Sequence, residues 1–317
     1  MKRKKILAGI LVIFAIIIFL MIMQAREYSW GAPGSKNYHL SLIHDNLTRN
    51  YWVHVPPGYD NEVPAMVVIY FHGGSGSSKS SYLDGMYPYS DKLGFILVSP
   101  AGTGPIPDRL LVWNAGQCCK YAIDRSIDDV GFISQMIDEL EGKFNIDKKS
   151  IYATGISNGA LMAYRLACEL PDKIAAVSAV APKAIPQNCS PSRPISIMQI
   201  HGTADTCNPY EGGIGNCPVQ ARPYFVPRPA KESVGFWKEM NNCPDRPETM
   251  YNKGNASCLE YGPCKAGTNV EFCTVKGMGH TWPSGIQYLP ESAVGPVSFD
   301  ISFDQMWDFF KKNPMRS

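Results

Sequence analysis

The chain has 317 residues, 45% of them hydrophobic, and a formal net charge of +2 at pH 7. Four of its 30 basic residues (Lys2, Arg3, Lys4 and Lys5) precede the first apolar run, and without them 26 basic residues stand against 28 acidic ones, a net charge of −2. No basic run occurs elsewhere, so the composition excludes nucleic acid as an expected partner. A chain of this size and hydrophobicity can bury a substantial core.

The N-terminal 25 residues read as a targeting segment. Residues 6–23 form an uninterrupted apolar stretch of 18 residues, which is long enough to span a bilayer. A cleavage site is poorly formed, because the bulky Met23 stands two residues before Ala25. We therefore interpret residues 1–25 as an uncleaved signal anchor in preference to a cleaved signal peptide. Both readings leave the basic cluster in the cytoplasm and place the rest of the chain outside it, secreted or tethered to the membrane by this segment alone.

The rest of the chain alternates strand and helix patterns. Segments 39–44 and 51–55 alternate apolar and polar residues and predict an antiparallel edge hairpin, closed by Asp45 and Asn46. Continuous apolar runs, typical of strands buried on both faces of a parallel sheet, lie at 65–71, 94–100, 174–180, 195–200 and 270–275. Helical patterns lie between or after them, at 128–141, 161–168, 230–240 and 301–312.

This alternation predicts an α/β fold with a mostly parallel, doubly wound sheet that opens with an antiparallel hairpin. Residues 26–38 are polar and contain Gly and Pro, so we interpret them as a linker from the membrane segment. We expect a single domain over residues 39–313, because no repeat or second boundary follows the linker.

The segment 151–168 predicts a strand, a sharp turn and a helix. The turn reads Gly155-Ile-Ser157-Asn-Gly159, the G-x-S-x-G pattern. In a nucleophile elbow the backbone bends so tightly that side chains two residues either side of the serine would clash. We predict Ser157 as a nucleophile; the alternative is an ordinary glycine turn.

Two later segments supply candidate partners for Ser157. Asp205 lies a few residues beyond the strand at 195–200, and His280 follows the strand at 270–275 on a glycine-rich turn. The carboxyl ends of parallel strands carry the functional groups of such sheets. The order Ser, Asp, His predicts Asp205 as the acid and His280 as the base. The alternatives are a local turn cap for Asp205 and a structural histidine for His280.

Backbone N–H groups are predicted to bind the oxyanion. One comes from Asn158, directly after the nucleophile, and the other from the loop that follows the strand at 65–71. There Gly74 is the first choice and Ser75 the second. A phosphate-binding loop is the alternative, but no Lys stands at the required spacing. His72 and His201 are interpreted as structural residues that anchor their loops.

All ten cysteines lie in the exported part of the chain, which predicts disulfides. No Cys/His group has the spacing of a zinc site, so we expect no metal. Four cysteines close in sequence are expected to pair among themselves: Cys243, Cys258, Cys264 and Cys273. The adjacent Cys118 and Cys119 are expected to bond elsewhere rather than to each other.

Five motifs resemble those of the secreted polyhydroxybutyrate depolymerase and feruloyl esterase group of α/β-hydrolases. They are Gly155-Ile-Ser-Asn-Gly-Ala, His201-Gly-Thr-Ala-Asp, Gly279-His-Thr-Trp-Pro, Trp113-Asn-Ala-Gly-x-Cys-Cys and Asp128-Asp-Val-Gly-Phe-Ile. The resemblance covers roughly residues 38–310. It implies an α/β-hydrolase fold and an exported esterase with Ser157 as nucleophile, His280 as base and Asp205 as acid. The long N-terminal segment and the cysteine-rich region 206–273 depart from the family pattern.

These features predict a serine carboxylic ester hydrolase that needs no cofactor. Trp113, Trp282 and Tyr210 are expected to line a pocket for a feruloyl-like ring, or else to pack under the loops. The expected substrates are phenolic esters of plant polysaccharides, with hydroxyalkanoate oligomers or acetylated xylan as alternatives. A peptidase is chemically open, because the same triad cleaves amides. A non-catalytic surface binding protein of the same fold is the rival from another class.

Overall fold

The structure is a computed structural model that describes residues 31–216 and 227–316. The predicted signal anchor or signal peptide, 1–25, and the first five linker residues lie outside the described residues. In the part that is described, every helix is too short or too polar to cross a membrane.

Ten strands within the described residues form one mixed sheet in the order β1-β2-β4-β3-β5-β6-β7-β10-β9-β8. Its middle, from β4 to β10, is parallel, and antiparallel pairs close both ends. The strands are β1 (Lys36–His44), β2 (Leu47–Val55), β3 (Ala65–Phe71), β4 (Ile96–Pro100), β5 (Ile146–Ile156), β6 (Ala176–Val180), β7 (Ser196–Gly202), β8 (Glu248–Lys253), β9 (Ala256–Tyr261) and β10 (Val270–Val275). The predicted parallel sheet with an antiparallel N-terminal hairpin is confirmed.

The N-terminal hairpin turns where the sequence predicts. Asp45 and Asn46 have φ values of 50° and 59°, which two-residue hairpin loops require and which these residue types tolerate. β1 begins at Lys36, so the last three residues of the predicted linker belong to the sheet. The C-terminal hairpin of β8 and β9 was not predicted, because β8 is largely exposed and carries no buried apolar face.

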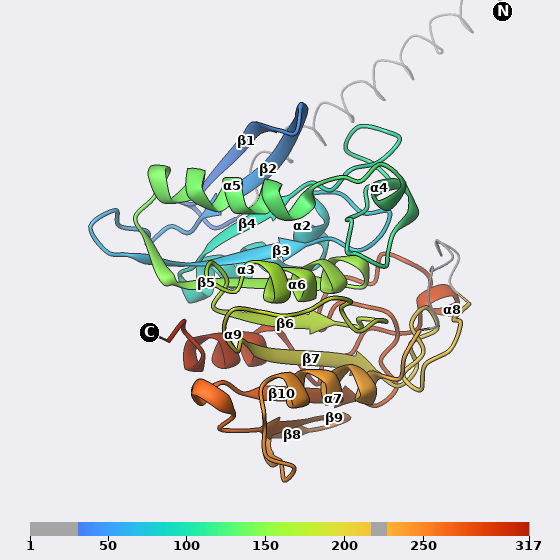
Figure 1. Ribbon diagram of the computed structural model, residues 1–317. Helices are drawn as coiled ribbons and strands as arrows, with labels where there is room; N and C mark the ends of the chain where they lie inside the picture. The colour runs from blue at the N-terminus through green and yellow to red at the C-terminus, as the bar shows by residue number, and fades with distance from the viewer. Residues whose placement is uncertain (1–30, 217–226, 317) are drawn as a thin grey trace, which may run out of the picture.

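Helices cover both faces of the sheet (Figure 1). Helices α5, α6 and α7 pack on one face and contribute to one buried cluster, and α3 and α9 cover the other face. Their bounds are α3 (Met86–Leu93), α5 (Asp129–Lys143), α6 (Asn158–Glu169), α7 (Ala230–Met240) and α9 (Phe303–Lys312). The shorter helices are α2 (Ser80–Leu83), α4 (Lys120–Asp124), α8 (Glu291–Val294) and the 3₁₀ turn η1 (Lys265–Gly267). The sheet is therefore doubly wound, as predicted.

Disulfides join several of these elements. Cys243 bonds Cys264, and Cys258 bonds Cys273, so the four cysteines predicted to pair among themselves do so. A further bond joins Cys168 to Cys189. The expectation for the adjacent pair is wrong: Cys118 and Cys119 bond each other. Residue spacing alone favoured distant partners, but the chain folds with both sulfurs on the same side of a tight loop.

Candidate active site

Three loops that follow parallel strands meet at one edge of the sheet. Ser157 follows β5, Asp205 follows β7 and His280 follows β10, so the structure brings the three predicted catalytic residues to the carboxyl ends of nearby strands. Functional sites of open α/β sheets lie at this edge. Ser157 and His280 line one cavity of about 110 Å³, and Asp205 lies buried against His280.

The turn between β5 and α6 holds Ser157 at φ 59° and ψ −117°, a conformation that non-glycine residues rarely adopt. A Cβ atom on Gly159 would lie 2.1 Å from the carbonyl oxygen of Phe71, and one on Gly155 would lie 2.5 Å from it. Only glycine permits this close approach to β3, as the G-x-S-x-G spacing predicts. The backbone N–H of Ser157 donates to the Val180 carbonyl at 2.9 Å, which ties the turn to the end of β6.

Asp205 and His280 form a hydrogen-bonded pair. One Asp205 oxygen lies 2.8 Å from Nδ1 of His280, and the Asp205 side chain has no exposed surface. The other oxygen accepts the backbone N–H groups of Cys207 at 2.9 Å and Asn208 at 2.7 Å. Burial by itself would raise the pKa of Asp205, but the charge and hydrogen bond of His280 outweigh it and lower that pKa. An ionised Asp205 keeps the proton on Nδ1 and leaves Nε2 of His280 able to accept one.

His201 supports the acid from the buried side. Its Nε2 donates to the Asn208 carbonyl at 2.8 Å and lies 3.6 Å from the Asp205 carboxylate. Burial lowers the pKa of His201 although the Asp205 charge opposes the shift, so the ring is neutral. In the described residues no hydrogen bond joins the Ser157 hydroxyl to His280. Such bonds are commonly long in ligand-free enzymes and tighten when substrate binds.

The loop after β3 lies against the nucleophile turn. A Cβ atom on Gly73 would stand 3.6 Å from Cβ of Ser157, and one on Gly74 would stand 3.8 Å from Cβ of Asn158. Gly73, Gly74 and Ser75 line the cavity together with Ser157 and Asn158. Because Asn158 is the first residue of α6, its backbone N–H has no acceptor within the helix. Both predicted oxyanion residues therefore border the cavity beside the serine.

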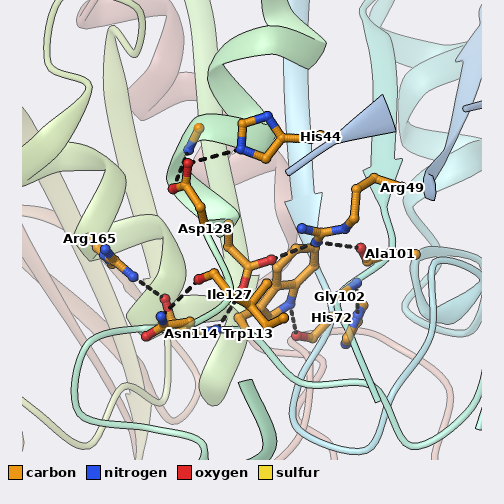
Figure 2. A network of polar contacts seen from close by, with 12 residues as sticks. His44, Arg49, His72, Ala101, Gly102, Trp113, Asn114, Ile127, Asp128 and Arg165 are labelled. Carbon is orange, nitrogen blue, oxygen red and sulfur yellow. Dashed lines mark hydrogen bonds and ion pairs between the residues drawn. The ribbon is translucent and has the colours of Figure 1, made fainter. Parts of the chain in front are cut away.

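His72 fixes the loop that carries Gly74. The backbone N–H of Gly102 donates to Nε2 of His72 at 3.1 Å, so the ring proton lies on Nδ1, which donates to the Gly73 carbonyl at 2.8 Å. Burial lowers the pKa of His72 to about 4, which keeps the ring neutral at physiological pH. The indole N–H of Trp113 donates to the His72 carbonyl at 3.0 Å (Figure 2). His72 is a structural residue, as expected.

A buried ion pair anchors the segment that carries Trp113 (Figure 2). Arg49, on β2, lies 2.6 Å from one oxygen of Asp129, and the other oxygen accepts the backbone N–H of Asn114 at 2.7 Å. Arg165 donates to the Asn114 carbonyl at 2.6 Å. The motifs at 113 and 128 are recognisable in the sequence, but their contact is not. The available signal was Arg49, a lone charge two residues before the predicted strand at 51–55, which the structure extends back to Leu47.

Asn158 joins this segment to the nucleophile helix through its side chain. Its Oδ1 accepts the backbone N–H of Trp113 at 2.7 Å, and its Nδ2 donates to the Trp113 carbonyl at 3.1 Å. Cys119, at the far end of the segment, lines the cavity. Asn158 therefore positions one wall of the cavity, which it lines beside Ser157.

The three aromatic residues predicted to bind substrate do not line this cavity. Trp113 is fully buried, and Trp282, 2% exposed, packs edge-on against Tyr70. Tyr210 is 9% exposed and its hydroxyl bonds the Thr274 hydroxyl at 2.7 Å. All three pack beneath the loops, because large rings there fill the space between the strand ends. Tyr288, Leu289, Val112 and Val294 supply the larger side chains of the cavity wall instead.

Two groups of side chains in the described residues lie close enough together to hold a metal ion. One combines Asp205, Cys207 and His280, and the other combines Cys258, Glu271 and Cys273. The cysteines of both groups are disulfide-bonded, so they offer no thiolate. Neither group has the donor set of a metal centre.

Lys183 is a cavity residue that sequence analysis missed. Lys183 lies three residues beyond β6 and is 8% exposed. It lines the cavity together with Ser157 and His280. Burial lowers its pKa, and the charge of Asp205 partly opposes that shift. A lysine directly after a buried apolar run was the signal in the sequence.

No protein-family model matches the chain. The chain is 31% identical over 252 residues to feruloyl esterase B of Piromyces equi, covering 75% of this chain and 43% of that protein. It is 28% identical over 272 residues to the putative esterase NocK of Nocardia uniformis subsp. tsuyamanensis, covering 80% and 76%. The chain thus spans less than half of the first relative. Among solved structures, an acetyl xylan esterase from Aspergillus awamori matches with a TM-score of 0.59 at 17% identity, over 87% of this chain and 99% of that one.

Proposed function

We propose that the chain is a serine carboxylic ester hydrolase of the feruloyl esterase group that works through Ser157, His280 and Asp205; its similarity to feruloyl esterase B supports the family, and the match to an acetyl xylan esterase supports the fold. The observation that carries the proposal is the 2.8 Å contact between Asp205 and Nδ1 of His280, beside a cavity that Ser157 lines from a nucleophile elbow. Residues of these types in this arrangement suit acyl transfer.

In the proposed reaction, Nε2 of His280 takes the proton of the Ser157 hydroxyl as the serine oxygen attacks the ester carbonyl. Asp205 holds the Nδ1 proton and stabilises the charged ring that forms. The backbone N–H groups of Gly74 and Asn158 bind the oxyanion. His280 then gives its proton to the leaving alcohol, and an acyl-enzyme remains on Ser157. Water, activated by His280, releases the acid and restores the serine, so the chemistry needs no cofactor.

We propose phenolic esters of plant polysaccharides as the first substrate class. The relationship to a feruloyl esterase supports it. A second hollow of about 600 Å³ shares Gly73, Gly74, Ser75, Tyr288 and Leu289 with the cavity, so the cleft continues past the oxyanion loop and has room for a bulky ester. Acetylated xylan is the alternative that the fold match to an acetyl xylan esterase supports. Hydroxybutyrate oligomers are the remaining alternative.

The test is hydrolysis of methyl ferulate by the purified protein, beside an acetylated xylan oligomer, a soluble hydroxybutyrate trimer and the Ser157→Ala variant. Ferulate release that falls by at least about 10⁴-fold in the variant is the expected result. Ser192→Ala is the matched control, because its hydroxyl bonds only Asp172 at the surface.

Cleavage of the xylan or trimer alone would keep the mechanism and change the substrate. No hydrolysis of any ester by a folded, oxidised protein would contradict the enzyme and favour the non-catalytic binding protein.

We further propose that the domain functions outside the cytoplasm. The disulfides support an oxidising compartment. The apolar run at 6–23 supports a tether to the membrane in preference to release. Extraction of membranes from cells that make the full chain distinguishes the two: a tethered protein stays with the membrane at alkaline pH, and a released one appears in the medium.

A further inference from the structure

Lys183 places a buried positive charge in the wall of the catalytic cavity. The residue is 8% exposed and lines the cavity with Ser157, Asn208 and His280. No aspartate or glutamate lines this cavity in the described part of the chain. The ammonium group is therefore the cavity's one fixed charge among the residues that the structure describes.

The ammonium group makes no direct contact with a carboxylate among the described residues. Within residues 31–216 and 227–316 no hydrogen bond or ion pair involves Nζ of Lys183. Asp205 is the carboxylate whose charge acts on it, but both oxygens of Asp205 already bind His280 and two backbone N–H groups. Residues 217–226 contain no acidic residue in the sequence.

The backbone holds Lys183 in place between the nucleophile and the acid. Val180 accepts the backbone N–H of Ser157, and the Ala181 carbonyl accepts the side-chain amide of Asn208 at 2.7 Å. The carbonyl of Lys183 itself accepts the backbone N–H of Arg228 at 3.3 Å. These contacts fix the backbone from which the Lys183 side chain reaches the cavity.

An unpaired buried charge costs several kcal/mol, and a group of opposite charge in the same dry space offsets that cost. The charge of Asp205 offsets part of this cost from a distance, but no carboxylate among the described residues contacts Nζ of Lys183, so a direct partner can come from outside the protein. A carboxylate fits, since an ammonium group donates strong hydrogen bonds to carboxylate oxygens.

We propose that Lys183 binds a carboxylate carried by the ester substrate, so that the enzyme prefers acidic esters over neutral ones. The carboxylate belongs either to the acyl part or to the alcohol part of the ester. The inference rests on the proposed esterase activity, because the carboxylate is recognised at the cavity where the ester is cleaved.

Two matched ester pairs test the inference and separate its two sources. Methyl 4-carboxycinnamate against methyl 4-methylcinnamate places the charge on the acyl part, and 4-carboxyphenyl acetate against 4-methylphenyl acetate places it on the alcohol part. The measured quantity is the ratio of kcat/KM for the anionic ester to that for the neutral ester. Comparing this ratio between variants cancels the intrinsic reactivity of each ester.

In Lys183→Met, we expect the ratio to fall on the order of tenfold for one of the pairs, because a hydrogen bond to a charged group is lost. Lys183→Arg keeps the charge and should retain most of the ratio. Lys231→Met, which removes an exposed charge from α7, should leave it unchanged. A ratio within twofold of the wild type in Lys183→Met, for both pairs, overturns the inference.

A measurement on the wild type alone guards against a variant that fails to fold. Benzoate should inhibit hydrolysis of 4-methylphenyl acetate competitively, and benzyl alcohol of similar shape should not. Equal inhibition by the two overturns the inference. If the protein hydrolyses anionic and neutral esters equally well, the proposed esterase function stands and only the role of Lys183 is overturned. If it hydrolyses no ester, the esterase function and the role of Lys183 are both overturned.

Discussion

Asp205 and Asp84 are both buried carboxylic acids, and their surroundings move their pKa values in opposite directions. Asp205 has the charge and hydrogen bond of His280 and two backbone N–H donors, which lower its pKa against the effect of burial. Asp84 is 1% exposed and accepts a hydrogen bond from the Tyr70 hydroxyl, while its other oxygen has no partner among the described residues. Burial raises its pKa to about 7. The pKa values of the two acids therefore differ because of the nearby charge and hydrogen-bond donors, and not because of how deeply each acid is buried.

Asp84→Asn should make the protein more stable at pH 8 and leave stability nearly unchanged at pH 4. A carboxyl group whose folded-state pKa is raised stabilises the fold while it is protonated, and this contribution is lost as the pH rises from about 4 through about 7. Asparagine resembles the protonated form at every pH. The gain in the free energy of unfolding at pH 8 should reach up to about 4 kcal/mol, at about 1.4 kcal/mol per pKa unit.

Urea unfolding at pH 4 and pH 8 measures the effect. Asp245→Asn, at a fully exposed position, controls for the general loss of one negative charge. A gain that is equal at the two pH values would show that Asp84 is ionised in the fold throughout.

At the scale of elements, the nucleophile turn depends on how closely β5 and α6 approach β3. The carbonyl oxygen of Phe71 occupies the space where a side chain of Gly155 or Gly159 would lie. A local pattern of glycines therefore encodes a contact with Phe71, which lies 84 residues before Gly155 and 88 before Gly159. The glycines are evident in the sequence, and only the structure identifies what they approach.

Gly159→Ala should abolish most activity and destabilise the fold by about 3 kcal/mol or more, because the new methyl group would lie 2.1 Å from a backbone oxygen that cannot move alone. The free energy of unfolding and kcat/KM for an aryl acetate measure the two effects. Gly235→Ala is the matched control in helix α7, where nothing lies within 4 Å of the added carbon. It should stabilise the protein by about 0.5–1 kcal/mol. Similar behaviour of the two variants would contradict the steric explanation.

Across the whole molecule, the disulfides between distant residues concentrate in the half that carries the acid and the base. Among the described residues, three such bonds lie between residues 168 and 273, and one of them joins the paired positions Cys258 and Cys273 on β9 and β10. The bond between Cys118 and Cys119 closes no loop. The loops that carry Asp205 and His280 therefore rest on a cross-linked frame.

Removing the bond between Cys168 and Cys189 by a double substitution to alanine should cost about 3 kcal/mol of stability, because the unfolded chain regains the freedom of a 21-residue loop. The same substitution at Cys118 and Cys119 is the control. It should cost far less, since adjacent residues release almost no chain entropy. Urea unfolding of both variants without reductant gives the comparison, and equal losses would argue against the loop-entropy explanation.

Local patterns were enough to predict much of this fold. The hairpin turn at Asp45 and Asn46, the buried central strands and the glycines around Ser157 depend on neighbours in the chain, so periodicity and residue type reveal them. The exposed β8–β9 hairpin and the disulfide between Cys118 and Cys119 escaped prediction. An exposed strand has no apolar period, and a bond between adjacent cysteines depends on how one loop closes.

By itself, the sequence determined the class of fold, the elbow and the order of candidate catalytic residues along the strands. Only the tertiary structure decided which side chains share a cavity, because the cavity forms where the loops that follow several different strands pack together. In the structure Trp113, Trp282 and Tyr210 do not line the cavity, since these large rings are buried beneath the loops. The tertiary structure brought Lys183 there instead, on a loop whose backbone is fixed by residues from both of its neighbours.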